Sequence, residues 1–400
     1  MAAVRRVAQP SVVAAALLVL AGAGAGSGSA AARGTRITMT MEAGPEVDSN
    51  VGRVEPGAGE AAVTSALFRA TSSVRATRRV GANHALDLTV KGGARVFLEE
   101  AAREYDVGVL QAQGQWAYRT RAPVILGLVA DHYEVFERTT TVPGATAADP
   151  ATSRDRDFRF SGVAGQAILT RGPDHRVVAR AGYRWFGYKP DAQFDFRGDT
   201  YSLEYLGHKD EVDTDGNVEA EYDWHLGYAL ARRDYSGDVL VPPCPSGATS
   251  TAASCLPQHR DQRRRDLYHA LSMGATYTGP IRADLDYQLT VTDSNSDGQS
   301  VLRHAGVLTL TKDLPWRVVG TVRGELQLLS FSDPLVVNRL AGQAFESIED
   351  ENRNSLLVQL ERPLDRRERL HLVGRYTLQS TSGAPLWRQL VFAGLSWSSE

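Results

Sequence analysis

Four ionisable side chains occupy alternate positions in the stretch NVEAEYDWHLGYAL at residues 217–230, namely Glu219, Glu221, Asp223 and His225. Aromatic and aliphatic side chains fill the positions between them. Carboxylates and an imidazole in a row can bind cations, exchange protons or line a path for a charged solute. Because alternate residues of a β-strand point to opposite faces, the pattern predicts a strand with one charged and one apolar face.

The same alternation recurs in residues 85–98, 281–292, 317–328 and 369–379. In each segment charged or amide side chains take one set of positions, and aliphatic or aromatic side chains take the other. We expect the charged set to line the interior of the fold. The candidate lining residues are Arg95, Arg180, Arg184, Glu219, Glu221, Asp223, Asp284, Asp286, Arg323, Glu325 and Arg375.

Motifs for catalysis or metal binding are incomplete. DTDGN at 213–217 has the opening of a calcium loop, but loop position twelve is Trp224 in place of the bidentate glutamate, so a turn is the better interpretation. His132 and Glu134 share a strand face without a third ligand. No serine stands out with a positioned histidine and carboxylate. The sequence therefore predicts no catalytic residue, no metal site, no cofactor and no enzyme.

Two folds produce alternating strands, a soluble sandwich and a transmembrane barrel. The alternating segments are longer than the usual ~5–6 residues of a sandwich strand. Links such as RRVGAN, TRAP and TGP are short, whereas those at 138–155, 235–265 and 331–351 are long. Short turns alternating with long loops are typical of an outer-membrane barrel, with short turns in the periplasm and long loops outside. We therefore predict an all-β, up-and-down, antiparallel barrel in the cell outer membrane.

Sixteen strands are predicted, and the pattern allows fourteen to eighteen because the edges of the eighth strand are blurred in 190–217. The predicted strands are 36–47, 62–77, 84–98, 105–119, 123–137, 156–170, 174–188, 199–208, 218–234, 266–278, 280–292, 300–311, 315–330, 352–362, 368–380 and 386–398.

The first residues have the layout of a cleaved secretory signal. Arg5 and Arg6 precede an apolar run at 12–20, and a tract of small residues follows. The run is well short of the ~20 residues that a membrane-spanning helix needs. We expect residues 1–32 to be removed and residues 33–400 to form one barrel domain.

Charge and cysteine content restrict the partners. A formal net charge of −3 does not predict binding to nucleic acid. Cys244 and Cys255 lie in a stretch rich in proline, serine and threonine, so a disulfide is predicted between them in an exported protein. The basic run RRRD at 263–266 either contacts lipopolysaccharide phosphates or is simply solvated. Outer-membrane lipid and lipopolysaccharide are the expected surroundings.

The stretch EAGPEVDSNVGRV at 42–54 resembles the first barrel strand of exopolysaccharide-export porins and of surface lipoprotein assembly modifiers. The helical repeat domain that often precedes the barrel in those families has no counterpart in the strand pattern here. The ending LVFAGLSWSSE is similar to the terminal aromatic signal of outer-membrane barrels, although three residues follow Trp397. The resemblance implies a barrel that exports a polysaccharide together with periplasmic export components.

Two functional hypotheses remain. The first is a transport conduit for an exported polysaccharide or another hydrated solute, with nutrient uptake as a variant. The second is a non-conducting scaffold, adhesion or motility-complex protein that works through its surface loops. The charged inner residues are compatible with both, because opposite charges either pair across strands and fill the barrel or leave a polar path open.

Overall fold

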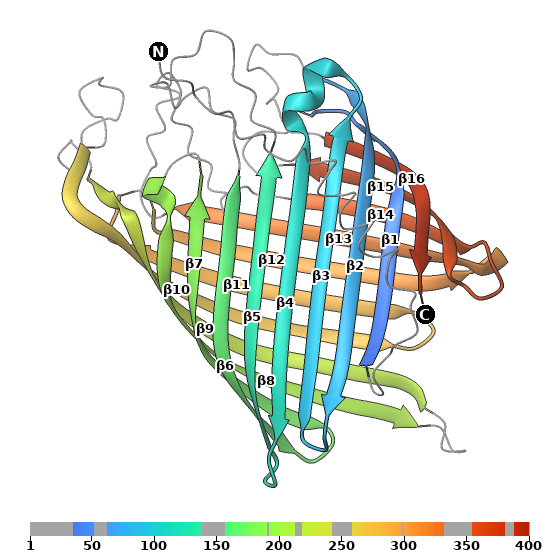
Figure 1. The fold of residues 1–400 in the computed structure, drawn as a ribbon, viewed down its shortest axis with the longest axis horizontal. Helices are drawn as coiled ribbons and strands as arrows, with labels where there is room; N and C mark the ends of the chain where they lie inside the picture. Colours follow the sequence, from blue (N-terminus) through green and yellow to red (C-terminus); the bar gives the residue numbers. More distant parts are fainter. Residues whose placement is uncertain are drawn as a thin grey trace, which may run out of the picture.

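The computed structural model describes residues 35–51, 62–137, 157–189, 192–212, 218–241, 258–297, 299–331, 354–380 and 388–399. Sixteen antiparallel strands form a closed barrel in which each strand pairs with its neighbours in the sequence and β1 pairs with β16 (Figure 1). The predicted fold class and strand number are confirmed. No helix among the described residues is long and apolar enough to cross a membrane.

The strands follow one another around the wall without crossovers. Their bounds are β1 Thr35–Asp48, β2 Ser65–Val80, β3 His84–Phe97, β4 Val107–Arg119, β5 Val124–Glu137, β6 Phe158–Arg171, β7 His175–Tyr188, β8 Phe196–Val212, β9 Val218–Val241, β10 Gln258–Thr278, β11 Arg282–Ser294, β12 Val301–Leu314, β13 Val318–Phe331, β14 Asn354–Pro363, β15 Leu370–Ser380 and β16 Arg388–Ser398. Short 3-10 helices are η1 Glu100–Tyr105, η3 Ala192–Phe194 and η4 Pro315–Arg317.

Three strands are longer than predicted. β8 extends at both ends, β9 continues from the predicted end at residue 234 to Val241, and β10 begins at Gln258 instead of residue 266. Residues 235–241 and 258–265 of the predicted link 235–265 are therefore strand, and residues 242–257 lie outside the described residues. The extensions pair with each other through an irregular register between Arg260 and Arg265.

The outer face of the wall is apolar. Leu226 and Tyr228 of β9, Leu203 of β8 and Leu285 of β11 are all exposed on this face. Near the periplasmic turn between β4 and β5, Trp116 stacks on the neighbouring ring of Tyr118. An apolar band edged by aromatic rings, on a wall with no open edge, is the arrangement that lipid requires. The chain is an integral β-barrel of the outer-membrane class.

Polar groups on this outer face are paired with one another. Three histidine Nδ1 atoms lie within hydrogen-bond distance of tyrosine hydroxyls on adjacent strands. The pairs are His175 with Tyr205 at 2.8 Å, His269 with Tyr228 at 2.7 Å and His304 with Tyr287 at 2.8 Å. Because an unsatisfied polar group in hydrocarbon is costly, each pair lets an imidazole lie on the lipid side.

The seam between β1 and β16 closes the barrel, and two glycines allow the strands to approach there. A Cβ added to Gly44 would lie 2.2 Å from the carbonyl oxygen of Ala393, and one added to Gly394 would lie 2.5 Å from the carbonyl oxygen of Ala43. Those atoms belong to the backbone, so no side chain can rotate away from a new methyl group.

We expect Gly44→Ala to destabilise the barrel by about 1–3 kcal/mol, because overpacking at a backbone contact forces the strands apart. Gly306→Ala is the matched control, since nothing lies within 4 Å of a Cβ at that position. The measurement is the free energy of unfolding in urea, followed by the change in gel migration on heating. Equal stability of the two variants would contradict this account of the seam.

The turn between β14 and β15 is organised by one carboxylate outside the membrane. Asp365 Oδ1 accepts hydrogen bonds from the backbone N–H of Leu370 at 2.9 Å and of Arg369 at 2.8 Å. These bonds, that from Leu370 first, hold the pKa of Asp365 below its usual value.

The pKa of Asp365 is lowered in the folded state. The stabilisation that its charged carboxylate gives to the turn is therefore fully present above the ordinary carboxyl pKa of about 4, and it is lost as the pH falls through the lowered value. We expect amide exchange at Arg369 and Leu370, corrected for intrinsic rates, to accelerate only in that acid range. In Asp365→Asn the corrected exchange should not depend on pH. The same acid acceleration in that variant would refute the assignment.

Candidate functional site: the charged inner wall

Strand register places the predicted lining residues on the inner face, except that Glu219 lies at a register irregularity and has no paired residue. Arg95 and Arg375 belong to the side formed by β15, β16 and β1 to β3. The others lie on β7, β9, β11 and β13, and these are Arg180, Arg184, Glu219, Glu221, Asp223, Asp284, Asp286, Arg323 and Glu325. The two sides differ in how their charges are satisfied.

Around the seam the charges are paired, and they are buried or half-buried. Arg388 of β16 donates from Nε to Asp48 Oδ1 of β1 at 2.9 Å and from Nη2 to Oδ2 through a shorter contact. The side chains of Asp48 and Arg388 are 0% and 7% exposed. The pair therefore holds β1 to β16 from inside the barrel and is screened from water.

A second layer of ion pairs lies beside it. Buried Glu46 accepts from Arg69 at 3.3 Å and lies 3.2 Å from Arg95. Arg375 donates to both carboxylate oxygens of Glu42, at 3.1 and 2.9 Å. Arg95 and Arg375 thus belong to a network that ties five strands together, so the cross-strand interpretation fits these two residues better than a pathway does.

The motif DSNV is part of the same structure. The backbone N–H of Asn50 donates to Asp48 Oδ1 at 3.1 Å. Val51 packs in an apolar cluster with Leu67 and Phe97. Asp48 and Asn50 are buried, so the motif orders the first strand and covers the ion pair. Sequence reasoning missed the partner Arg388 because 340 residues separate it from Asp48.

We expect Arg388→Gln to cost about 3–5 kcal/mol in unfolding free energy, because it leaves a buried carboxylate without its partner. Arg180→Gln is the comparison, since Arg180 pairs with Glu204 at 3.4 Å where its side chain is exposed. An exposed pair is worth about 0–1 kcal/mol. Urea unfolding measures both changes, and a loss at position 388 no larger than that at 180 would show that the seam pair is dispensable.

The opposite side presents its charges to the interior. On β8 and β9, His208 lies between two carboxylates, with Nδ1 2.8 Å from Asp223 and Nε2 2.9 Å from Asp210. His225 approaches Asp286 of β11 at 3.8 Å. The side chains of Asp223 and Asp286 are 56% and 59% exposed. These carboxylates therefore remain accessible to water and to a passing solute.

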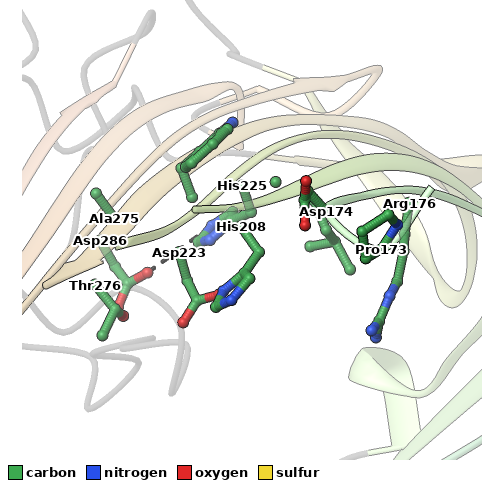
Figure 2. Close-up of a pocket in the computed structure, with 12 residues that line it drawn as sticks. Pro173, Asp174, Arg176, His208, Asp223, His225, Ala275, Thr276 and Asp286 are labelled. Atoms are coloured by element: carbon green, nitrogen blue, oxygen red, sulfur yellow. Dashed lines mark hydrogen bonds and ion pairs between the residues drawn. The ribbon is translucent and has the colours of Figure 1, made fainter. Parts of the chain in front are cut away.

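A pocket of about 350 Å³ lies among these groups near the periplasmic end. Figure 2 shows His208, Asp223, His225 and Asp286 gathered on one side of it, with Arg176 on the other. Its lining combines three carboxylates, two imidazoles and one guanidinium, those of Asp174, Asp223, Asp286, His208, His225 and Arg176. Such a lining suits a small hydrated solute that carries positive charge.

The remaining predicted residues pair more loosely. Asp284 accepts from Arg282 and, at 2.9 Å, from the hydroxyl of Thr276. Arg323 lies 3.7 Å from Glu325. Glu219 and Glu221 are exposed near the periplasmic start of β9.

Toward the outer end, the inner face becomes aromatic, which sequence reasoning missed. Rings from five consecutive strands contact one another at centroid distances of 5.6, 5.7, 5.2 and 5.2 Å, in the order Tyr133, Phe158, Phe186, Phe196 and Tyr235. Two guanidinium groups cover the end of this row, Arg233 over Phe196 at 4.9 Å and Arg264 over Tyr235 at 4.1 Å. We call this arrangement the aromatic row.

The smaller motifs of the sequence fall on different parts of the chain. Among the described residues, no group of three or more His, Cys, Asp or Glu side chains is arranged to hold a metal. His132 lies on the outer face, 2.8 Å from Ser161 and 3.5 Å from Glu134. The predicted disulfide between Cys244 and Cys255, the turn at 213–217 and the signal segment 1–32 lie outside the described residues.

Comparison with known proteins finds likeness only in structure. No protein-family model matches the chain, and no curated protein matches it in sequence. A loop-deleted OmpT of Vibrio cholerae superposes with a TM-score of 0.43 at 12% identity, covering 91% of this chain and 99% of that one. A BenF-like porin of Pseudomonas fluorescens gives 0.45 at 9%, covering 91% and 98%.

A third similar structure is OccK2 (OpdF) of Pseudomonas aeruginosa in complex with glucuronate. It gives a TM-score of 0.40 at 12% identity, covering 91% of this chain and 96% of that one. Scores and identities this low transfer neither a solute nor a residue role, so the function must be argued from this chain's own inner wall.

Proposed function

We propose that the protein is a passive channel for small hydrated solutes across the outer membrane. The observation that carries the proposal is the exposure of charged side chains on the inner face of β7 to β11, above all Asp223 and Asp286. A barrel filled by its own side chains would bury those charges in pairs, as the seam network does. Charged groups left in water line a polar path.

The periplasmic end of this path favours cations. Inward-facing carboxylates gather where β8, β9 and β11 meet the short turns, and they are Asp210, Glu221, Asp223, Asp284 and Asp286. Arg282 is engaged by Asp284 at 3.1 Å, which offsets one charge of each sign. A mouth with excess negative charge raises the local concentration of cations and repels anions.

In planar bilayers we expect stable conductance steps and a reversal potential in a potassium chloride gradient that indicates a preference for potassium. Asp223→Asn with Asp286→Asn should keep the conductance and move the reversal potential toward zero, because two exposed carboxylates of the inner wall are neutralised. The matched control is Asp199→Asn with Glu211→Gln, which removes two carboxylates from the outer face. That control should behave as the unmodified protein does.

Two results would overturn parts of the proposal. Absence of conductance from protein whose folding is verified by heat-modifiable migration would refute the channel. It would favour the scaffold hypothesis, in which the surface loops act. Conductance with an unchanged reversal potential in the double variant would leave the channel and refute the cation-selective mouth.

Export of a polysaccharide is a finer hypothesis within the same class. Its support is the resemblance of residues 42–54 to export barrels, together with an inner face that carries both charge and the aromatic row. In the same bilayers, oligosaccharides added on the periplasmic side should then block the current for times that lengthen with chain length. Blocks independent of chain length would favour small solutes.

A further inference from the structure

A cluster of arginines lies on the outside of the barrel, on the outer ends of β8, β9 and β10. Register pairs Arg197 with Asp234 and Asp234 with Arg265, and pairs Arg232 with the exposed Leu267. All four charged side chains therefore project from the wall away from the lumen. The site is separate from the proposed solute path and goes beyond it.

This concentration of charge is confined to one sector of the wall. On the described strands β12 to β16 and β1 to β4, register places no Lys, Arg, Asp or Glu on the outer halves of the outward face. Typical occupants there are Leu302, Leu328 and Leu378. A local function rather than general solubility is therefore the better explanation for the arginines.

The height of the cluster matches the outer edge of the membrane. Tyr222 and Arg232 both face outward on β9, Tyr222 near the periplasmic end. Ten residues of a strand tilted by ~45° rise about 24 Å, which is close to the ~25 Å apolar band of such barrels. Arg232 therefore lies where lipid headgroups begin.

Arg232 and Arg265 are held in place before any ligand binds. Asp234 Oδ1 accepts from Arg232 Nη2 at 3.2 Å and lies 3.3 Å from Arg265 Nε. The backbone N–H of Arg265 donates to Asn295 Oδ1 at 2.7 Å. Each guanidinium has five N–H donors, so these contacts orient the fork and leave other N–H groups for an anion.

A hollow of about 320 Å³ lies between these side chains, and Arg232, Arg265, Leu267, Asp293 and Asn295 are among its lining residues. Below it the outer face is apolar, with Leu267, Leu271 and Tyr228 exposed. Polar donors above an apolar surface fit a molecule with a charged head and hydrocarbon chains, whereas a soluble anion would make no use of the lower part.

We propose that Arg232 and Arg265 bind the phosphate of a phosphorylated lipid of the outer leaflet, with its acyl chains along β9 and β10. Three arginines, Arg197, Arg232 and Arg265, stand against two carboxylates, Asp234 and Asp293, so the cluster keeps a net positive charge. Arginine forks recognise phosphate through paired N–H donors. The basic run at 263–266 divides accordingly, with Arg265 outward and Arg264 and Asp266 paired at 2.6 Å inside.

The test uses the full mature protein folded in an uncharged detergent, with diphosphoryl lipid A as the probe and native mass spectrometry as the readout. The variant is Arg232→Gln with Arg265→Gln. The matched control is Arg171→Gln with Lys209→Gln, which removes two cations from the outward face at the periplasmic end. Heat-modifiable migration verifies folding of each protein.

We expect the affinity for lipid A to fall about tenfold or more in the arginine variant and to stay unchanged in the control, since two charge-assisted forks are lost. Dephosphorylated lipid A should bind the unmodified protein as weakly as lipid A binds the variant. Equal binding by the variant, or by the dephosphorylated lipid, would overturn the proposal. Displacement of lipid A by inorganic phosphate alone would assign the site to a soluble anion and would also overturn it.

Discussion

Closure of the wall is the constraint on which the rest of the structure depends. In hydrocarbon every backbone N–H and C=O must find a partner within the protein, so the first and last strands have to meet. Here they meet twice. Backbone pairing of β1 with β16 runs along the seam, where Gly44 and Gly394 let the chains approach. The buried pair of Asp48 and Arg388 spans the same strands from inside.

That double closure divides the inner wall into two parts with different physical states. Around the seam, Glu46, Asp48 and Arg388 are buried and their paired neighbours are half-buried, so these charges act as pairs and are held away from a solute. From β7 to β11 the charges remain in water, where the cost of desolvation is avoided and each carboxylate keeps its field. A solute that crosses this barrel would therefore run along the β7 to β11 side. Charged residues of the same types are thus paired around the seam and exposed to water on β7 to β11. The interpretation as cross-strand pairs fits the first group, and the interpretation as a solute path fits the second.

Period-two alternation was sufficient to predict the barrel and its sixteen strands, and it divides the charged residues of each strand from the apolar ones. The alternation within one strand separates its two faces, so the face on which Glu221 and Asp223 lie can be predicted without knowing which strands are adjacent. Lateral partners are not local. Nothing in the sequence links Asp48 to Arg388, and nothing distinguishes Arg375, which is half-buried against Glu42, from Arg180, which is exposed. The predicted disulfide of Cys244 with Cys255 stays a prediction.

The strand ends that were predicted wrongly follow from a reversal of the pattern itself. Above the membrane water lies outside the wall, so the apolar side chains of β9 switch to the inner face. Tyr235 and Val239 point inward and are buried, whereas Asp234 and Asp238 point outward. The alternation of apolar and polar residues continues through residue 241. Before residue 234 the apolar residues face outward, and after it they face inward. A prediction that requires apolar residues on the outer face therefore ends the strand near residue 234. The same reversal places the aromatic row on the inner face of the wall and the arginine cluster on its outer face. The position at which the apolar residues of a continuous barrel strand change from the outer to the inner face therefore marks the height of the membrane surface.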